Sequence, residues 1–222
     1  GSDSLDRESI NDLVKAMCQT TTNELAEKPP RMYMLLRLAD VAYFNMGRPK
    51  IIWKEIWETI SMQIIDAGSM ENVDIAKPTI NVLWQITRKF IEQPETKAFH
   101  FQEHFLRPFF EIFIVQQSSE VKGLIVECTQ SLVNDLADSL HSGWSVVFQI
   151  LNACANDYRT KGYELMSKIV NEHLEDLSDP QVVHLQSVLI SFVVKGKTPK
   201  IGAKAVLLFE NIASFLSMKK AD

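Results

Sequence analysis

A short apolar pattern that occurs three times constrains the fold of this chain more than any other feature of its sequence. Each copy places large aromatic residues at positions i and i+4, an apolar residue at i+3 and an aliphatic residue at i+7. The three copies are Trp53-Ile56-Trp57-Ile60, Phe105-Pro108-Phe109-Ile112 and Trp144-Val147-Phe148-Leu151. Successive copies begin 52 and 39 residues apart, close on average to the roughly 40–47 residues of a HEAT unit. The recurrence predicts stacked helix pairs, with chance repetition of common helical spacings as the alternative.

A second recurrence supports the same register. Ile75, Val82 and Ile86 match Val121, Cys128 and Leu132 at an offset of 46 residues. Proline normally interrupts a helix, but the first helix of a HEAT unit often carries a proline kink, so Pro108 agrees with this interpretation. One helix pair cannot bury its apolar side alone, and neighbouring pairs must therefore stack. We expect an all-α, HEAT/armadillo-like right-handed α-solenoid of about ten helices.

The boundaries of these helices follow from proline, glycine and polar clusters. Apolar residues between the clusters recur at spacings of three and four, and no convincing strand alternation occurs. The expected breaks are Pro29-Pro30, Gly47 to Pro49, Gly68 to Asn72, Pro94, Gln117 to Glu120, Ser142-Gly143, Asn156-Asp157, Ser178 to Pro180 and Gly196 to Pro199.

The charge of the chain argues against nucleic acid as a partner. Its net charge is −5, whereas nucleic-acid binders cluster Lys and Arg against phosphates. The longest basic cluster, Lys195 to Lys200, contains Gly196 and Pro199 and is typical of a solvated loop. Three cysteines lie far apart within apolar helical patterns, which favours free thiols and a reducing compartment. They are Cys18, Cys128 and Cys154.

The ends of the chain indicate a fragment of a longer protein. The polar start GSDSLDRES has no signal-peptide core, and no uninterrupted apolar run approaches the roughly 20 residues that span a bilayer. Gly1-Ser2 resembles the remnant of a protease site. We expect residues 1–9 to be a flexible start and residues 10–218 to form a single HEAT-like repeat domain.

One group of residues has the spacing of a metal site. His100, Glu103 and His104 match the inverted zinc-protease signature, with two histidines one helical turn apart. A zinc site needs a third protein ligand, and the sequence places neither Glu111 nor Glu127 beside the pair. We therefore expect no metal at His100 and His104, which would face solvent. A metallohydrolase that binds stoichiometric zinc remains the enzymatic alternative.

Other catalytic signatures are missing from the sequence. The chain has no Gly-x-Ser-x-Gly elbow, no Walker loop and no Rossmann glycine fingerprint, and its cysteines lie without a neighbouring base. Acidic pairs such as Glu24 with Glu27 are typical of solvated helix surfaces. We expect no enzymatic site and no cofactor in this chain.

Three longer strings carry a family resemblance. They are PRMYMLLRLADVAYFNMGRPKIIWKEIW (Pro30 to Trp57), FHFQEHFLRPF (Phe99 to Phe109) and LHSGW (Leu140 to Trp144). Together they resemble the first HDS domain of the large Golgi exchange factors for Arf GTPases, the brefeldin-A-inhibited type and its yeast trans-Golgi relative. The resemblance is strongest over residues 10–155, and the assignment of residues 156–218 depends on helical periodicity.

The resemblance implies a non-catalytic regulatory domain of a guanine-nucleotide exchange factor. Such a domain lies downstream of the catalytic domain, would engage GTP-bound Arf or restrain the catalytic domain, and would thereby control Golgi recruitment and vesicle formation. It implies a cytosolic protein that is peripheral on trans-Golgi membranes. With a net charge of −5, direct adhesion to an acidic bilayer would be weak, so membrane association would be indirect. The alternative is a nucleotide-insensitive HEAT scaffold for inter-domain or dimer contacts.

Family positions carry over at the three strings only. Gly47 and Gly143 fit turns between helices, and Phe109 and Trp144 fit the core. Among the exposed polar members, Arg48 and Arg107 are candidate partner contacts, although both could instead be ties within the stack. The full set is Asn45, Gly47, Arg48, Phe101, Gln102, Phe105, Arg107, Pro108, Phe109, Ser142, Gly143 and Trp144.

Overall fold

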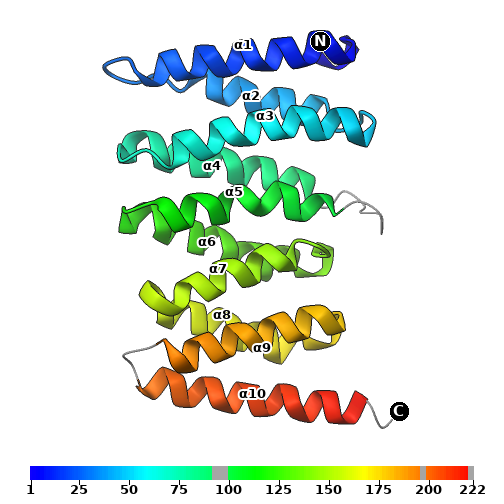
Figure 1. The fold of residues 1–222 in the computed structure, drawn as a ribbon, viewed down its shortest axis with the longest axis vertical. Helices are drawn as coiled ribbons and strands as arrows, with labels where there is room; N and C mark the ends of the chain where they lie inside the picture. Colours follow the sequence, from blue (N-terminus) through cyan, green and yellow to red (C-terminus); the bar gives the residue numbers. More distant parts are fainter. Residues whose placement is uncertain (92–99, 196–198, 220–222) are drawn as a thin grey trace. The chain divides into compact units, whose positions relative to one another are not determined.

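The chain is built from α-helices joined by short connections (Figure 1). The computed structural model describes residues 1–91, 100–195 and 199–219. Within these ranges it contains ten α-helices, three short 3₁₀-helices and no β-strand. The predicted all-α class and the predicted number of helices are confirmed.

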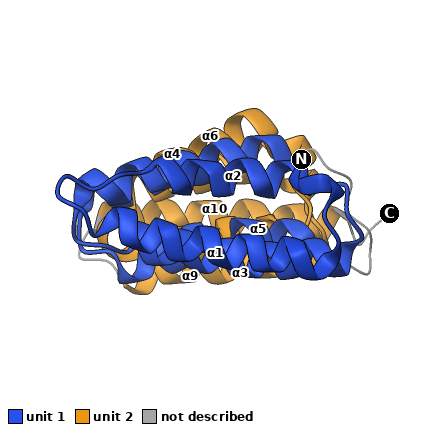
Figure 2. Ribbon diagram, turned by 90° about the horizontal axis from the view of Figure 1, so that it is seen from above, with its two compact units in different colours: residues 1–125 blue, residues 126–222 orange. Residues whose placement is uncertain are grey.

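The described residues form two compact units, which Figure 2 shows in different colours. The division falls between Ile125 and Val126, inside one continuous helix. The expectation of a single domain over residues 10–218 stays a prediction.

Unit 1 consists of two layers of helices. Helices α1, α3 and α5 succeed one another in one layer, and α2 and α4 lie in the other (Figures 1 and 2). Each helix packs against its chain neighbour and against the next helix of its own layer, as stacked helix pairs do. The elements are η1 (Ser2–Ser4), α1 (Arg7–Leu25), α2 (Tyr33–Phe44), α3 (Lys50–Gly68), α4 (Val73–Phe90), α5 (Phe101–Val115) and the start of α6 (Ser119–Leu136).

Unit 2 continues the same pairing. Helix α7 packs on α8 and α9, and α10 packs on α8 and α9. The elements are the rest of α6, η2 (Ala137–Ser139), α7 (Trp144–Asp157), α8 (Arg159–Glu172), η3 (Leu174–Asp176), α9 (Asp179–Val194) and α10 (Pro199–Lys219).

Helix ends follow the local sequence signals. The Asp6 carboxylate accepts the Ser9 N–H at 2.8 Å and caps α1, so the helix begins at Arg7, within the stretch expected to be a flexible start. A capping box of Ser178 and Gln181 begins α9. The predicted breaks lie in or beside the segments between helices. Those at Pro94 and at residues 196–198 fall outside the described residues.

The repeated apolar pattern forms the core. All twelve of its residues are buried. In unit 1 the Trp57 ring lies 5.1 Å from Phe105 and 6.3 Å from Phe90, centroid to centroid. In unit 2 Trp144 stacks on Phe148 at 5.7 Å. The pattern therefore marks the residues that join helices to each other.

Pro108 explains one polar contact inside this core. Proline has no N–H, so residue 108 cannot donate to the carbonyl of His104, four residues earlier in α5. The Trp57 indole donates to that carbonyl at 3.2 Å. The proline of the repeat thus leaves a carbonyl through which α5 is linked to α3.

Glycine is required by packing at a position that the sequence did not reveal. Gly47 and Gly143 lie at inter-helix turns as predicted, but no described glycine has a positive φ. In α8, however, a Cβ on Gly162 would lie 2.9 Å from Cys154 Cβ and 2.9 Å from the Phe192 ring. A Cβ on Gly123, in α6, would meet no atom within 4 Å.

The same substitution should therefore have opposite effects in two helices. Gly123→Ala should raise the free energy of unfolding by about 0.5–1 kcal/mol, because alanine favours helix over glycine. Gly162→Ala should lower it, because overpacking costs about 1–3 kcal/mol and outweighs that gain. Urea denaturation followed by circular dichroism measures both. Equal effects of the two substitutions would contradict the close helix contact at Gly162.

Candidate protein-binding surface

We call the three strings that carry the family resemblance the family blocks, numbered in chain order. The first block, Pro30 to Trp57, holds the N-terminal segment in place. Arg48 donates from its guanidinium to the carbonyls of Ser2, Asp3 and Leu5, at 3.0, 3.1 and 2.6 Å. Its Nε also donates to Asn45, which is fully buried. These bonds favour the alternative raised for Arg48, a tie within the fold.

The second family block separates into core and surface. Phe101, Phe105 and Phe109 are buried, as is Pro108. The buried Gln102 donates to the carbonyl of Ile91 at 3.0 Å, at the end of α4. Of the block's carried positions, Arg107 alone is exposed, and it pairs with Glu111 one turn later at 2.7 Å.

The third family block begins α7 in unit 2. The carbonyls of Ser142 and Gly143 accept backbone N–H groups from the first turn of α7, and Trp144 is buried. Ser142, Gly143 and Trp144 therefore have a structural role at the N-terminus of α7.

Arg107 lies on the rim of a groove between α3 and α5. Trp53, Trp57 and Pro108 line the groove, and Met62 and Ile65 extend its apolar lining. Its polar lining consists of Lys54, Glu58, Ser61, His104, Arg107 and Glu111. The groove thus combines an apolar lining with a charged rim, which is the composition of many protein-binding surfaces.

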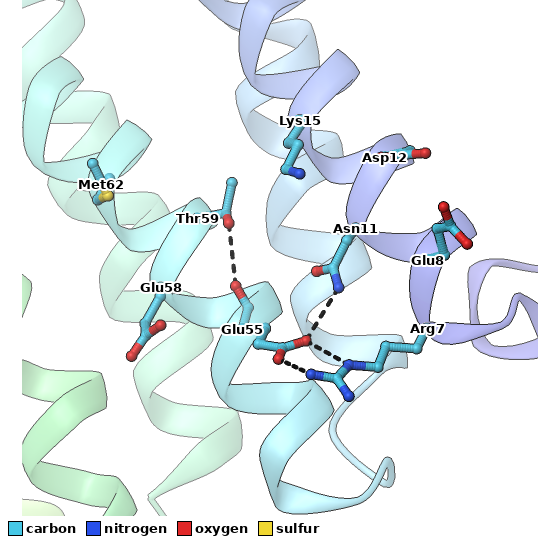
Figure 3. Close-up of a pocket in the computed structure, with 9 residues that line it drawn as sticks. All are labelled: Arg7, Glu8, Asn11, Asp12, Lys15, Glu55, Glu58, Thr59 and Met62. Carbon is cyan, nitrogen blue, oxygen red and sulfur yellow. Dashed lines mark hydrogen bonds and ion pairs between the residues drawn. The ribbon is translucent and has the colours of Figure 1, made fainter.

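A second groove runs between α1 and α3 (Figure 3). Its lining is polar: Arg7, Glu8, Asn11, Asp12, Lys15, Glu55, Glu58, Thr59 and Met62. Glu58 and Met62 belong to both grooves, so α1, α3 and α5 present one continuous surface of unit 1. We call it the α1–α3–α5 face. Met62 is 66% exposed and is the large apolar side chain most accessible there.

Ion pairs fix part of this face and leave other charges unpaired. Arg7 forms a bidentate ion pair with Glu55, which also accepts from Asn11 (Figure 3). The hydrogen bond from Arg7 holds the pKa of Glu55 below its ordinary value. Glu8, Asp12 and Lys15 have no ion pair within the part of the chain that the structure describes. A partner can therefore meet both ordered and unpaired charges.

The nucleophilic and metal candidates are dispersed. Burial raises the pKa of Cys18 to about 11, and burial raises the pKa of Cys128 and of Cys154 to about 12, which keeps all three as thiols. The His100 and His104 side chains are exposed at the start of α5. Neither belongs to the group of possible metal ligands that the described residues bring together elsewhere, in unit 2.

Helix α10 differs from what the sequence led us to expect about membranes. Its segment Lys200–Met218 is 19 residues long, with a mean hydropathy of 1.4 over its most apolar window. By length and composition it could cross a membrane, and 17% of that window is buried. The buried residues Ala205, Leu208 and Ile212 nevertheless give α10 a packing side, as in a helix of a stack.

Sequence reasoning missed the contribution of Gln116. This buried residue donates to the carbonyls of Gly68 and Met70, at 2.9 and 3.1 Å, and accepts from the backbone of Gln117 and Ser118. It ties the end of α5 to the end of α3. A glutamine directly after an apolar helix was the available signal, but such residues are usually exposed.

The layered helix pairs place the chain among helical-repeat proteins. Residues 89–172 match the family model described as Mon2/Sec7/BIG1-like, HDS. That segment belongs to the Sec7-like HDS family, and the chain is homologous to part of the brefeldin A-inhibited guanine nucleotide-exchange proteins.

The similarity to these relatives extends over most of the chain. Brefeldin A-inhibited guanine nucleotide-exchange protein 1 of Arabidopsis thaliana is 30% identical over 226 residues, and the alignment covers 98% of this chain and 13% of that protein. Exchange protein 4 of the same plant is 32% identical over 183 residues, and the alignment covers 80% of this chain and 11% of that protein. Human brefeldin A-inhibited guanine nucleotide-exchange protein 1 is 29% identical over 227 residues, and the alignment covers 98% of this chain and 12% of that protein. The chain thus spans about one-eighth of the length of these relatives.

Proposed function

We propose that this chain is a non-catalytic regulatory domain of a large Arf guanine-nucleotide exchange factor and that its α1–α3–α5 face binds GTP-bound Arf. Homology to brefeldin A-inhibited exchange proteins supports the assignment of the chain to an exchange factor. The observation that carries the binding role is the continuity of the two grooves through Glu58 and Met62. A broad surface with an exposed apolar side chain among charges fits a folded protein better than a small substrate.

The parent protein would carry the exchange chemistry in another domain. In this proposal, binding of activated Arf, or contact with the catalytic domain, regulates exchange and draws the protein to Golgi membranes for vesicle formation. Membrane attachment would then be indirect, through Arf. The competing proposal is a scaffold whose contacts do not depend on nucleotide.

Flotation with liposomes that carry lipidated Arf tests the proposal. Arf is loaded in parallel with a non-hydrolysable GTP analogue or with GDP, and we expect the chain to float only with the GTP form. Arg107→Glu places a like charge beside Glu111 on the groove rim, and we expect it to reduce binding about tenfold or more.

Arg37→Glu is the matched control. Arg37 is also an exposed arginine in a one-turn ion pair, with Asp40 at 2.9 Å, but it lies on α2 in the other layer. The side chains of Arg107 and Arg37 are 62% and 50% exposed. Equal flotation with both nucleotides would favour the scaffold. Nucleotide-dependent binding that both substitutions weaken equally would place the contact elsewhere.

A further inference from the structure

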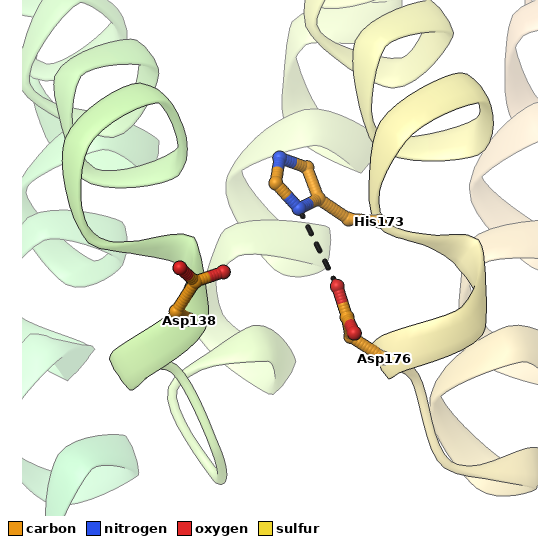
Figure 4. A group of neighbouring side chains, drawn as sticks. All are labelled: Asp138, His173 and Asp176. Atoms are coloured by element: carbon orange, nitrogen blue, oxygen red, sulfur yellow. Dashed lines mark ion pairs between the residues drawn. The ribbon is translucent and has the colours of Figure 1, made fainter.

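Three side chains with metal-binding atoms meet in unit 2. Asp138 lies in η2, His173 directly follows α8, and Asp176 lies in η3. One ligand atom from each lies within 4.8 Å of the others. His173 Nδ1 is 3.6 Å from an Asp176 carboxylate oxygen. Figure 4 shows the imidazole and the two carboxylates around one space between the ends of α6 and α8.

An internal repeat brings these residues together. The segment NDLADSL at 134–140 recurs as NEHLEDL at 171–177, an offset of 37 residues. Ala137 and Leu174 are buried at matching positions. Helices α6 and α8 lie side by side, because Lys168 on α8 reaches Asn134 on α6 at 2.7 Å. The two equivalent helix ends therefore sit next to each other.

His173 departs from this repeat in a way that suggests a ligand. It takes the position that Leu136 occupies in the preceding copy, so an imidazole replaces an aliphatic side chain. Its side chain is 15% exposed, and its ring packs against Trp144 at 6.3 Å. The buried Trp144 indole N–H has no hydrogen-bond partner among the described residues. Packing against Trp144 thus holds the imidazole in place.

The donor set selects a class of metal. One imidazole nitrogen and two carboxylate oxygens fit zinc, which binds such atoms at about 2.0–2.2 Å and in open sites uses three protein ligands. Tetrahedral coordination places ligand atoms about 3.4 Å apart, close to the His173–Asp176 spacing. Calcium and magnesium prefer oxygen alone, so the imidazole favours a transition metal.

We propose that Asp138, His173 and Asp176 form a divalent transition-metal site, with zinc as the fitting ion, that ties the end of α6 to the end of α8. Asp138 and Asp176 are exposed at their 3₁₀-helices, so their carboxylates can rotate inward to meet the ion. The ion would neutralise two carboxylates that otherwise face each other beside one histidine. It would act as a clamp between helix ends and need not take part in any reaction.

Zinc titration of the tag-free, chelator-treated chain by calorimetry tests the proposal, in buffer with excess magnesium. We expect one zinc per chain and a higher unfolding temperature that chelator reverses. Replacing a residue that only hydrogen-bonds to a metal ligand typically weakens metal binding about 10–100-fold. Asp138→Asn, His173→Ala and Asp176→Asn remove direct ligands, so each should weaken zinc binding by at least that much. The two aspartates are exposed, so their variants keep the test valid if His173→Ala unfolds.

Two substitutions serve as controls. Asp135→Asn removes an exposed carboxylate of α6 outside the cluster, and His104→Ala removes an exposed imidazole of unit 1. Neither should change zinc affinity. Cobalt binding gives a second readout, since the visible spectrum of bound cobalt should report mixed nitrogen and oxygen ligands. Absence of saturable zinc binding, or binding that survives all three cluster variants, would overturn the proposal.

Discussion

Trp57→Ala should lower the free energy of unfolding by about 3–5 kcal/mol, the usual cost of removing a buried large aromatic side chain. Trp57 stacks on Trp53 at 5.9 Å and also contacts Phe90 and Phe105. Its removal would leave a cavity among rings from α3, α4 and α5. Urea denaturation followed by circular dichroism measures the loss.

A smaller change at the same residue isolates the polar part of this contact. Trp57→Phe keeps a ring but removes the donor to the His104 carbonyl, so we expect a loss of about 1–2 kcal/mol. In a Pro108→Ala background, residue 108 regains an N–H that can reach that carbonyl. Trp57→Phe should then cost less, with a coupling of about 0.5–1 kcal/mol. The same cost in both backgrounds would show that the proline and the indole act independently.

Arg159→Met should destabilise unit 2 by about 2–4 kcal/mol, because it leaves two buried carbonyls without their charged donor. Arg159 is 9% exposed and donates to Ala155 at 2.8 Å and to Phe192 at 2.6 Å. These carbonyls lie at the C-terminal ends of α7 and α9, where a positive charge also favours the helix dipoles.

Two comparisons make the Arg159 prediction specific. Arg159→Lys keeps the charge but lacks the fork that reaches both carbonyls, so it should fall between wild type and Arg159→Met. Arg37→Met, at an exposed ion pair, should change stability by less than about 0.5 kcal/mol. If Arg159→Met were as mild as Arg37→Met in urea denaturation, the guanidinium would not be holding these helix ends together.

The sequence was sufficient for the helices and their buried sides, since both follow from spacing along one chain. The aromatic positions Phe109 and Trp144 were predicted as core and are buried. Proline and glycine clusters also placed the breaks, because their effect on the backbone is local.

Contacts between helices were harder to predict, because they depend on which helix ends become neighbours. Gln116 and Arg159 are polar residues that the sequence would place on the surface, yet each satisfies carbonyls from another helix. Conversely, Arg48, a candidate partner contact, donates hydrogen bonds from its guanidinium to backbone carbonyls inside unit 1. The trio Asp138, His173 and Asp176 spans 39 residues and becomes visible only once α6 and α8 are paired.

The exposed position of Met62 makes the α1–α3–α5 face sensitive to oxidation. Its thioether belongs to both grooves and lies in solvent, where oxidants can reach it. Conversion to the sulfoxide would turn the most accessible apolar side chain of the face into a polar one. The buried rings of Trp53 and Trp57, which line one of these grooves, would keep their packing. One oxygen atom would then alter what this face can bind while leaving the helices folded, and methionine sulfoxide reductase could restore it.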